Sequence, residues 1–390
     1  MSVKNIVMLG FGDMGKGIAQ VCLMGGFNVT AVDIDDNIIQ EGLKYNRSGF
    51  EKLEAKGVLP KGLKVVDLME RLKVNKDLIN AVKDADLVIE AVVEKLDIKQ
   101  KLCKDVIENS SDHCIFASNT SSISITEIAK KCNNPKNVIG MHFFNPAPLM
   151  RLVEVIKGEK SSEDAMNIGV EVSKKLPCLR GERYVARVLK DHPGFIVNRV
   201  LAPANIYSNY IIDLAYEKGI PWEHVDADLS TPNAPMSRLT LADFTGRDIA
   251  YHAGLYYAEK LSPDFQPGKV LTMQYNEGLL GKKTGQGFYN WSKGRPQPNL
   301  SKKAGLVDHR IFDAINANEG CRILEEGVIK SWKVIDEAIL AGMNFPGPMA
   351  NATTKFKELA ELLEKTSKEI GKPYLMPCDL FRSGNFVKMV

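Results

Sequence analysis

Three glycines near the N-terminus constrain the fold of this chain more than any other feature. The segment Gly10-Phe-Gly12-Asp-Met-Gly15 follows a short apolar run, Asn5–Leu9, and opens a stretch with helical spacing of apolar residues. In such a segment the first glycine allows a tight turn, the second lets the backbone approach a pyrophosphate, and the third lets strand and helix pack closely. The pattern predicts a strand, a phosphate-binding turn and a helix whose N-terminus faces an anion. A glycine turn without a ligand is the alternative.

The segments that follow continue the alternation of strand and helix. Short runs rich in Val and Ile are typical of strands buried on both faces of a sheet. They lie at 5–9, 28–32, 86–92, 114–117, 138–141 and 152–156. The helical patterns between them predict βαβ units and a largely parallel, Rossmann-type sheet. The lysine-rich stretch at about 36–83 departs from this rhythm and is expected to be a helical insertion.

The character of the sequence changes near Pro193, where strand-like runs give way to long helical ones. This change predicts an α/β domain over residues 1–190, followed by an all-helical domain over 191–291. After a loop-rich break, a further helical region is expected over 300–390. Trp222 and Trp332 lie in similar segments 110 residues apart, so the last region is interpreted as a degenerate second copy of the helical domain, with chance similarity as the alternative.

Composition excludes several classes of protein. The 51 Lys and Arg residues nearly balance 48 Asp and Glu, a net charge of +3 that is too even to indicate a nucleic-acid partner. The chain has no apolar run of 18 residues and no signal-peptide pattern, so we expect no membrane span and a cytoplasmic location. Seven scattered cysteines without a Cys-x-x-Cys pair predict reduced thiols, with neither a disulfide framework nor a metal site.

An acidic residue at the end of the second predicted strand indicates which nucleotide binds. Asp33 lies 18 residues after Gly15, where a carboxylate accepts hydrogen bonds from the ribose of a dinucleotide. Because a carboxylate there repels a 2′-phosphate, NAD is favoured over NADP. The neighbouring Asp35 and Asp36 are better explained as cap residues of the next helix.

Polar residues follow two later strands. Ser118-Asn-Thr-Ser-Ser122 follows the run 114–117, and His142 follows the run 138–141. Both lie at carboxyl ends of strands, where open α/β sheets bind ligands. Glu154 lies inside the apolar run 152–156, and a carboxylate buried there needs a partner. With His142 as that partner, the pair would form a general base; a structural histidine and a solvent-facing Glu154 are the alternatives.

Taken together, these motifs make the chain resemble the 3-hydroxyacyl-CoA dehydrogenase family over about residues 5–291. The resemblance rests on Gly10-x-Gly12-x-x-Gly15, Ser118-Asn-Thr-Ser-Ser122, His142-Phe-Phe-Asn-Pro146, Leu152-Val-Glu154-Val, Pro193-Gly-Phe-Ile-Val-Asn198-Arg199 and Gly281-Lys-Lys-Thr-Gly-Gln-Gly-Phe-Tyr289. It implies reversible, NAD-dependent oxidation of (S)-3-hydroxyacyl-CoA to 3-oxoacyl-CoA in fatty acid metabolism. A short acyl chain, as in 3-hydroxybutyryl-CoA and acetoacetyl-CoA, is the expected substrate.

The resemblance also implies roles for individual residues. His142 would remove the proton of the substrate 3-hydroxyl while C3 delivers hydride to nicotinamide C4, and Glu154 would orient and support His142. Ser121 would hydrogen-bond the substrate oxygen, Asn198 would hold the acyl group, and Asn145 would line the same site. A cap or turn serine and a polar residue at the start of a helix are the structural alternatives for Ser121 and Asn198.

For the cofactor, the family pattern adds three residues to the glycine turn and Asp33. The expected NAD-binding set is Gly10, Gly12, Asp13, Met14, Gly15, Asp33, Glu94, Lys99 and Asn119. In the family the helical insertion meets the CoA moiety, so Lys56 is expected to bind CoA, with Ser48 or Lys52 assisting. A solvated basic face explains these lysines equally well.

The chain also departs from the family pattern. Pro235-Met-Ser-Arg238 stands where Gly-Pro is common, which affects the acyl pocket or a subunit contact. Single-copy relatives pair through their helical domains, and a tandem copy would cover the same surface, so both a monomer and a homodimer are open. Two rival functions remain: a dehydrogenase of free 3-hydroxy acids, which commonly has lysine where this chain has Asn198, and a non-catalytic nucleotide-binding relative.

Overall fold

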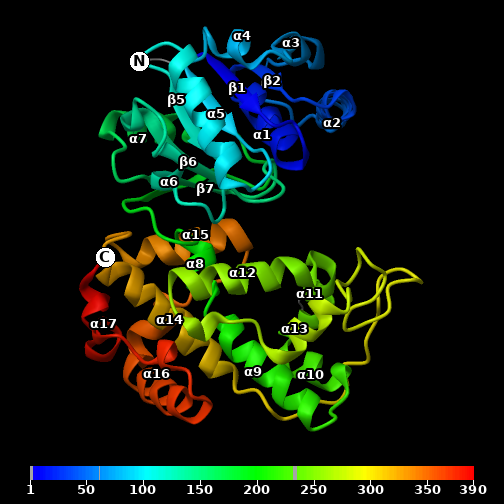
Figure 1. The fold of residues 1–390 in the computed structure, drawn as a ribbon, viewed down its shortest axis with the longest axis vertical. Helices are drawn as coiled ribbons and strands as arrows, with labels where there is room; N and C mark the ends of the chain where they lie inside the picture. Colours follow the sequence, from blue (N-terminus) through cyan, green and yellow to red (C-terminus); the bar gives the residue numbers. More distant parts are fainter. Residues whose placement is uncertain (1–2, 61, 232–234) are drawn as a thin grey trace. The chain divides into compact units, whose positions relative to one another are not determined.

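An eight-stranded sheet is the main feature of the N-terminal part of the chain in the computed structural model, which describes residues 3–60, 62–231 and 235–390 (Figure 1). The strand order is β3-β2-β1-β4-β5-β6-β7-β8. The strands are β1 Asn5–Leu9, β2 Asn28–Val32, β3 Leu72–Val74, β4 Leu87–Glu90, β5 Ile115–Ser118, β6 Val138–Phe143, β7 Leu152–Lys157 and β8 Tyr184–Val188. All neighbouring strands are parallel except β6 and β7. The expected parallel-dominated, Rossmann-type sheet is confirmed.

Two compact units make up the chain. The first runs to Asn198 and includes Ile323–Gly347 and Val390, and the second comprises Arg199–Arg322 and Pro348–Met389. The helices of the first unit are α1 Asp13–Met24, α2 Asp36–Ala55, α3 Val65–Glu70, α4 Leu78–Val82, α5 Leu96–Asn109, α6 Ile125–Ala129, η1 Pro135–Asn137, α7 Glu163–Lys175 and α15 Trp332–Met343. The short helix α8, Val197–Leu201, begins in the first unit and ends in the second.

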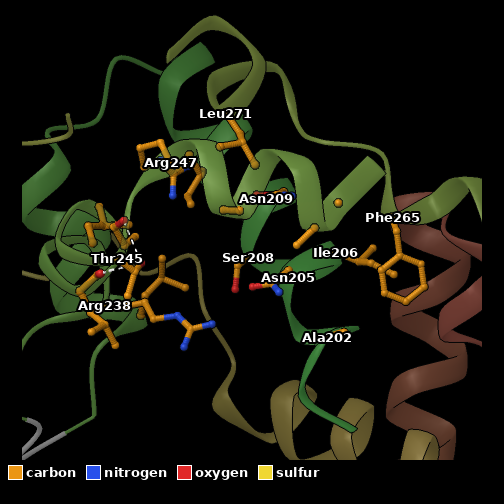
Figure 2. A pocket seen from close by; sticks show the side chains of 18 of the residues that line it. Ala202, Asn205, Ile206, Ser208, Asn209, Arg238, Thr245, Arg247, Phe265 and Leu271 are labelled. Carbon is orange, nitrogen blue, oxygen red and sulfur yellow. Dashed lines mark hydrogen bonds between the residues drawn. The ribbon is translucent and has the colours of Figure 1, made fainter. Parts of the chain in front are cut away.

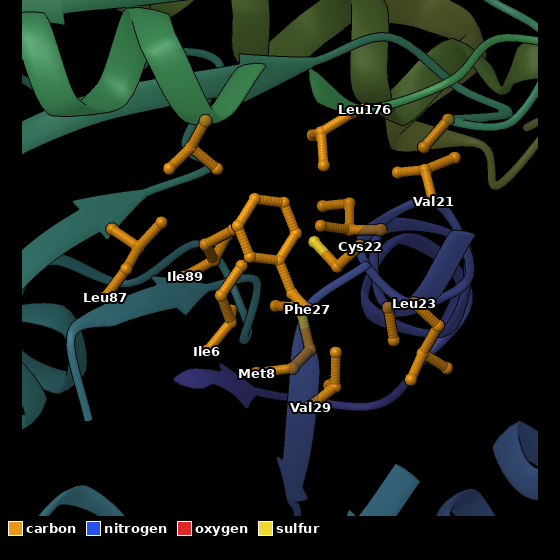
Figure 3. Close-up of a cluster of buried hydrophobic side chains, with 14 of the residues drawn as sticks. Ile6, Met8, Val21, Cys22, Leu23, Phe27, Val29, Leu87, Ile89 and Leu176 are labelled. Atoms are coloured by element: carbon orange, nitrogen blue, oxygen red, sulfur yellow. The ribbon is translucent and has the colours of Figure 1, made fainter. Parts of the chain in front are cut away.

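Packing between α1 and the sheet forms a central part of the first unit's core. Ile6 of β1 and Ile89 of β4 are at most 1% exposed, and Phe27 lies between them and Cys22 of α1 (Figure 3). Alternating strands and helices bury apolar side chains on the sheet, as the strand-like runs predict. The result is a rigid platform that fixes the ends of β1, β4, β5 and β6.

Two strands were not expected from the sequence. β3, Leu72–Val74, lies inside the predicted helical insertion, which otherwise forms α2, α3 and α4. Only its first residue, Leu72, is buried. A strand of three residues is too short to show the alternation of apolar and polar residues that predicts a strand. β8, Tyr184–Val188, pairs in parallel with β7 in the segment before Pro193, and the first unit continues past residue 190 to Asn198.

Helix α15 differs from the expected division of domains. It lies in the region expected to belong to the second helical copy, yet it packs on β7 and β8 of the first unit. Ile335 and Ile339 are fully buried on its inner face. A Cβ at Gly342 would lie 2.9 Å from the Leu152 side chain, so glycine permits this close approach to β7.

The second unit is helical. Its elements are α9 Ala204–Glu217, α10 Trp222–Leu229, α11 Arg238–Thr245, α12 Arg247–Lys260, η2 Pro263–Phe265, α13 Lys269–Asn276, α14 His309–Glu325, which ends in the first unit, α16 Met349–Ile370, η3 Pro373–Leu375, α17 Asp379–Ser383 and η4 Asn385–Lys388. The element order repeats, because η3 and α17 begin 110 residues after η2 and α13. This is the spacing of Trp222 and Trp332, and it supports the interpretation of a second copy.

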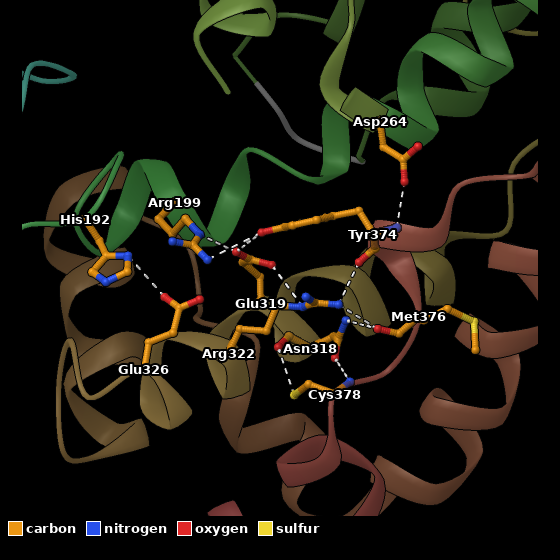
Figure 4. Close-up of polar contacts among 10 residues, drawn as sticks. All are labelled: His192, Arg199, Asp264, Asn318, Glu319, Arg322, Glu326, Tyr374, Met376 and Cys378. Atoms are coloured by element: carbon orange, nitrogen blue, oxygen red, sulfur yellow. Dashed lines mark hydrogen bonds and ion pairs between the residues drawn. The ribbon is translucent and has the colours of Figure 1, made fainter. Parts of the chain in front are cut away.

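Contacts join the two copies inside the second unit. The backbone N–H of Tyr374 donates to the Asp264 carboxylate at 2.6 Å, and the Tyr374 ring packs edge-on against Phe265 at 4.8 Å between centroids. Arg199 and Glu319 form a buried ion pair, and the Tyr374 hydroxyl donates to Glu319 at 2.7 Å (Figure 4). Among the described residues, no helix is both long and apolar enough to cross a membrane.

Candidate active site

The glycine turn has the geometry that its sequence predicts. Gly10 has a φ of +82°, and a Cβ there would lie 2.6 Å from the Ala91 carbonyl oxygen. A Cβ on Gly15 would lie 1.9 Å from the Gly10 oxygen, so only glycine allows strand and helix to approach this closely. A Cβ on Gly12 would meet no atom within 4 Å, so open space borders the N-cap of α1. Free N–H groups of the first turn can therefore receive an anion from this side.

Asp33 follows β2 and supports this turn directly. Its Oδ2 accepts a hydrogen bond from the backbone N–H of Phe11 at 2.8 Å, and its Oδ1 accepts one from Asp35 N at 3.2 Å. Each carboxylate oxygen keeps acceptor capacity for a ribose hydroxyl. Asp35 caps α2 by accepting from Asn37 N at 2.8 Å, so its expected cap role is confirmed; Asp36 is instead the first residue of the helix and pairs with Lys76 at 2.7 Å.

A buried ion pair lies at the end of β4, and sequence reasoning found only part of it. The Lys99 ammonium lies 2.7 Å from Glu90 and 3.1 Å from Glu94, and its side chain is 1% exposed. Glu90 is fully buried and also accepts from the Ser118 hydroxyl at 2.6 Å. Glu90 was not predicted, although an acidic residue ending an apolar strand needs a partner for the reason that applies to Glu154.

Glu94 connects this pair to the polar loop after β5. It accepts hydrogen bonds from the hydroxyls of Thr120 and, at 3.0 Å, Ser122, and from Ser121 N at 3.3 Å. Burial alone would raise the pKa of Glu94, but the Lys99 ammonium and the hydroxyl donors outweigh burial and hold this pKa below its usual value. Glu94 is therefore a carboxylate at neutral pH.

Asn119 and Ser121 have different positions in that loop. The Asn119 Oδ1 accepts from Phe143 N at 2.8 Å, so this side chain joins the ends of β5 and β6. Ser121 is exposed, which leaves its hydroxyl open to a ligand.

His142 and Glu154 are brought together by the one antiparallel pairing in the sheet. They are register partners across β6 and β7, so both side chains point to the same face. The His142 Nδ1 lies 2.7 Å from the Glu154 Oε2, and the residues are 6% and 0% exposed. Because a carboxylate only accepts, Nδ1 carries the proton and Nε2 is left as the basic nitrogen.

Backbone donors complete the surroundings of Glu154. Its Oε1 accepts from Ile196 N and Val197 N, each at 3.1 Å. The rings of Phe144 and Phe195 lie 4.6 and 5.7 Å from the His142 ring, between centroids. Three donors thus satisfy the oxygens of this buried carboxylate and fix its orientation toward His142.

Four other predicted residues have surroundings of their own. Asn198 is half-buried on α8, directly after Val197, and Asn145 is exposed just after β6. Ser48 on α2 donates to the Tyr45 carbonyl at 3.2 Å, and Lys56 is exposed at the C-cap of α2. The hydrogen bonds of the described residues do not join any of these four to His142.

The first turn of α1 contains the other two residues expected to bind the cofactor. Asp13 is exposed and pairs with Lys16 at 2.6 Å, while Met14 is half-buried against the core. Among the described residues, no group of three or more His, Cys, Asp or Glu side chains is placed to hold a metal ion.

These features define an α/β dinucleotide-binding protein with a buried histidine–carboxylate pair near the carboxyl end of β6, at the same edge of the sheet as the nucleotide turn. Comparison with known families gives the same class. Residues 5–178 match the 3-hydroxyacyl-CoA dehydrogenase NAD binding domain, and residues 194–291 match the 3-hydroxyacyl-CoA dehydrogenase C-terminal domain. The chain belongs to the 3-hydroxyacyl-CoA dehydrogenase family, whose members are oxidoreductases that act on CH–OH groups.

Individual relatives cover different shares of the chain. The crystal structure of (S)-3-hydroxybutyryl-CoA dehydrogenase from Ralstonia eutropha is 34% identical, with a TM-score of 0.67 over 75% of this chain and 100% of that one. The 3-hydroxybutyryl-CoA dehydrogenase of Escherichia coli K12 shares the fold over 100% of this chain and 99% of its own, with a TM-score of 0.85 at 24% identity. The fatty acid oxidation complex subunit alpha of Vibrio campbellii is 34% identical over 98% of this chain and 55% of its own length. The chain thus spans about half the length of the curated relatives it matches.

Proposed function

We propose that this chain catalyses the reversible, NAD-dependent oxidation of (S)-3-hydroxyacyl-CoA to 3-oxoacyl-CoA. The observation that carries the proposal is the 2.7 Å contact between His142 Nδ1 and the buried Glu154 carboxylate, which leaves Nε2 as a base. The names of the relatives from Ralstonia eutropha and Escherichia coli favour a short acyl group, as in 3-hydroxybutyryl-CoA.

The pair would act as a tuned general base. Nε2 of His142 takes the proton of the substrate 3-hydroxyl, and bound NAD supplies the acceptor for the hydride from C3. Glu154 holds Nδ1–H, which keeps the ring in the required tautomer, and its charge stabilises the imidazolium that forms. In the reverse direction His142 returns the proton to the carbonyl oxygen. Phe144 and Phe195 limit the access of water to the ring.

The residues around the glycine turn fit NAD. Open space beside Gly12 and the uncapped N-terminus of α1 suit the pyrophosphate, and Asp33 suits the ribose diol. Lys99 is buried beneath Glu94, so we assign it to positioning Glu94 rather than to direct contact with the cofactor. Asn119 would position His142 through its bond to Phe143 N.

The remaining predicted residues would bind the substrate. Ser121, Asn145 and Asn198 are proposed to contact the 3-oxygen and the acyl group, because their side chains are at least partly accessible. Ser48 and Lys56 are proposed to meet CoA from α2. None of the seven cysteines, all among the described residues, is in a disulfide, which is in keeping with a reducing, cytoplasmic setting.

Consumption of NADH with acetoacetyl-CoA tests the proposal, run beside NADPH and beside free acetoacetate. We expect loss of NADH absorbance only with the CoA ester, and little turnover with NADPH. Turnover of free acetoacetate at the same rate would favour the free-acid dehydrogenase. No turnover with acetoacetyl-CoA or with longer 3-oxoacyl-CoA esters would refute the proposal and leave a non-catalytic nucleotide-binding protein.

A further inference from the structure

A cavity of about 230 Å³ lies among α9, α11, α12 and α13 of the second unit (Figure 2). Most of its wall is apolar, with Ile206, Leu239 and Leu271 among the lining side chains. It contains none of the residues assigned above to the reaction or to NAD. At about 30 Å³ of liquid volume for each water molecule, this space would hold several waters and is large enough for a small organic ligand.

Arg238 gives this apolar cavity a positive charge. Figure 2 shows its guanidinium extending from α11 toward Ser208 and Asn205 of α9. Arg238 is an exposed residue of the lining, so its guanidinium is accessible to a ligand from solvent. No aspartate or glutamate lies among the described residues that line the cavity.

The second arginine of the lining has a structural role instead. The Nε of Arg247 donates to the Gln274 side chain at 2.8 Å, and its guanidinium stacks on the Phe288 ring at 4.6 Å. Arg238 is therefore the cation placed to meet a ligand.

The chemistry of this site selects among anions. One guanidinium matches a carboxylate with two parallel hydrogen bonds, and the Asn205 amide can add a neutral donor. A phosphate would bring more charge than one arginine balances in an apolar wall. We propose that the cavity binds a carboxylate carried by a short aliphatic chain, with Arg238 as its cation.

Two sources could supply this group. One is a free short-chain carboxylate. The other is a carboxylate at the far end of the acyl group of a CoA thioester, which rests on the proposed function.

Titration of the whole chain with hexanoate, followed by NMR of the ligand, tests the site itself. We expect hexanoate to bind more tightly than hexanol, and Arg238→Gln to weaken hexanoate at least about 10-fold, the usual loss with a charge-assisted hydrogen bond. Arg238→Lys should bind hexanoate with intermediate affinity, because lysine keeps the positive charge but cannot donate two parallel hydrogen bonds from a planar group. Lys303→Gln, which removes an exposed cation of the same unit, should leave binding unchanged. Equal binding by wild type and Arg238→Gln, or no binding to wild type up to about 50 mM, would overturn the proposal.

Turnover then separates the two sources. 3-Oxoadipyl-CoA and 3-oxohexanoyl-CoA have acyl groups of equal length, and only the first has a distal carboxylate. If Arg238→Gln lowers the ratio of their kcat/KM values about 10-fold, the carboxylate belongs to the substrate. An unchanged ratio with Arg238-dependent hexanoate binding identifies a free carboxylate. If neither ester is turned over, the proposed function fails, while the hexanoate titration still decides the fate of the cavity proposal.

Discussion

Replacement of Glu154 by glutamine removes one charge while keeping the size and shape of the side chain. The amide oxygen can still accept from Ile196 N and Val197 N, as the carboxylate does at 3.1 Å. The amide nitrogen then faces His142 Nδ1 at the position of the present 2.7 Å bond, and two N–H groups cannot pair. The ring must move its proton to Nε2, which abolishes the base, or lose the bond.

The magnitude follows from these contacts. When the histidine loses its supporting carboxylate and adopts the wrong tautomer, kcat should fall about 10²- to 10⁴-fold. This corresponds to a rise of roughly 3–5 kcal/mol in activation free energy. Binding of NADH should stay unchanged, because the glycine turn and Asp33 do not contact Glu154. We expect the drop in kcat with acetoacetyl-CoA, measured by NADH absorbance, with NADH affinity measured separately by fluorescence titration.

A matched control shows whether the loss of any carboxylate has this effect, or only the loss of the one that contacts His142. Glu171→Gln removes an exposed carboxylate from α7 and should leave kcat and stability within error of wild type. The reasoning is wrong if Glu154→Gln retains kcat within about 3-fold and keeps the pH profile of the wild type.

Four further expectations follow from other parts of the structure. Asp33→Ala should relax discrimination against NADPH in kcat/KM, and an unchanged preference would remove Asp33 from the ribose site. Glu319→Gln leaves the buried Arg199 and the half-buried Arg322 without their carboxylate and should lower the free energy of unfolding by about 3–5 kcal/mol, measured by urea denaturation; a loss below about 1 kcal/mol contradicts this. The Cys103 thiol donates to Cys132 and lowers the pKa of Cys132 to about 7, so Cys132 is increasingly a thiolate as the pH rises past neutrality. Iodoacetamide at pH 7.5 should therefore modify Cys132 first by peptide mapping, and Cys103→Ala should slow that reaction; equal rates would exclude the pairing. Since the second copy packs against the first inside one unit, sedimentation should show a monomer, and a tight dimer through residues 190–290 would exclude that role of the second copy.

The strands of the sheet were predictable where burial on both faces leaves a continuous apolar run. β1 and β2 begin and end at the predicted residues, because polar and glycine residues flank runs of Val and Ile. β3 and β8 lack this signal, because β3 has only three residues around Lys73 and Arg187 interrupts the apolar run of β8. Their pairing partners are set by the rest of the sheet.

The position of α15 could not have been predicted from its own sequence. Its apolar stripe predicts a helix with one buried face and does not say which surface buries it. A helix from a duplicated region is expected to pack within that region. The surface of β7 and β8 is available only because β8 extends the sheet, so the error at β8 and the error at α15 have one cause.

Within the site, side-chain pairs were easier to predict than backbone donors. Glu154 could be paired with His142 because a carboxylate in an apolar strand needs a donor. The same argument applied to Glu90 would have found Lys99, nine residues later in the chain. The amides of Ile196 and Val197 have no signal of their own in the sequence, since every residue except proline has an N–H group.

Those two amides change what Glu154 does. The carboxylate orients His142 and also joins β7 to the start of α8. Its position therefore depends on the segment after β8 being folded. Loss of either donor would leave Oε1 of Glu154 without a hydrogen-bond partner in a buried site, and the carboxylate would no longer be held in place against His142. A backbone displacement at Ile196 or Val197 would therefore lower turnover by moving Glu154 away from His142, without touching the substrate. Stability and turnover are therefore coupled at Glu154, and both the free energy of unfolding and kcat should be measured for variants of this residue.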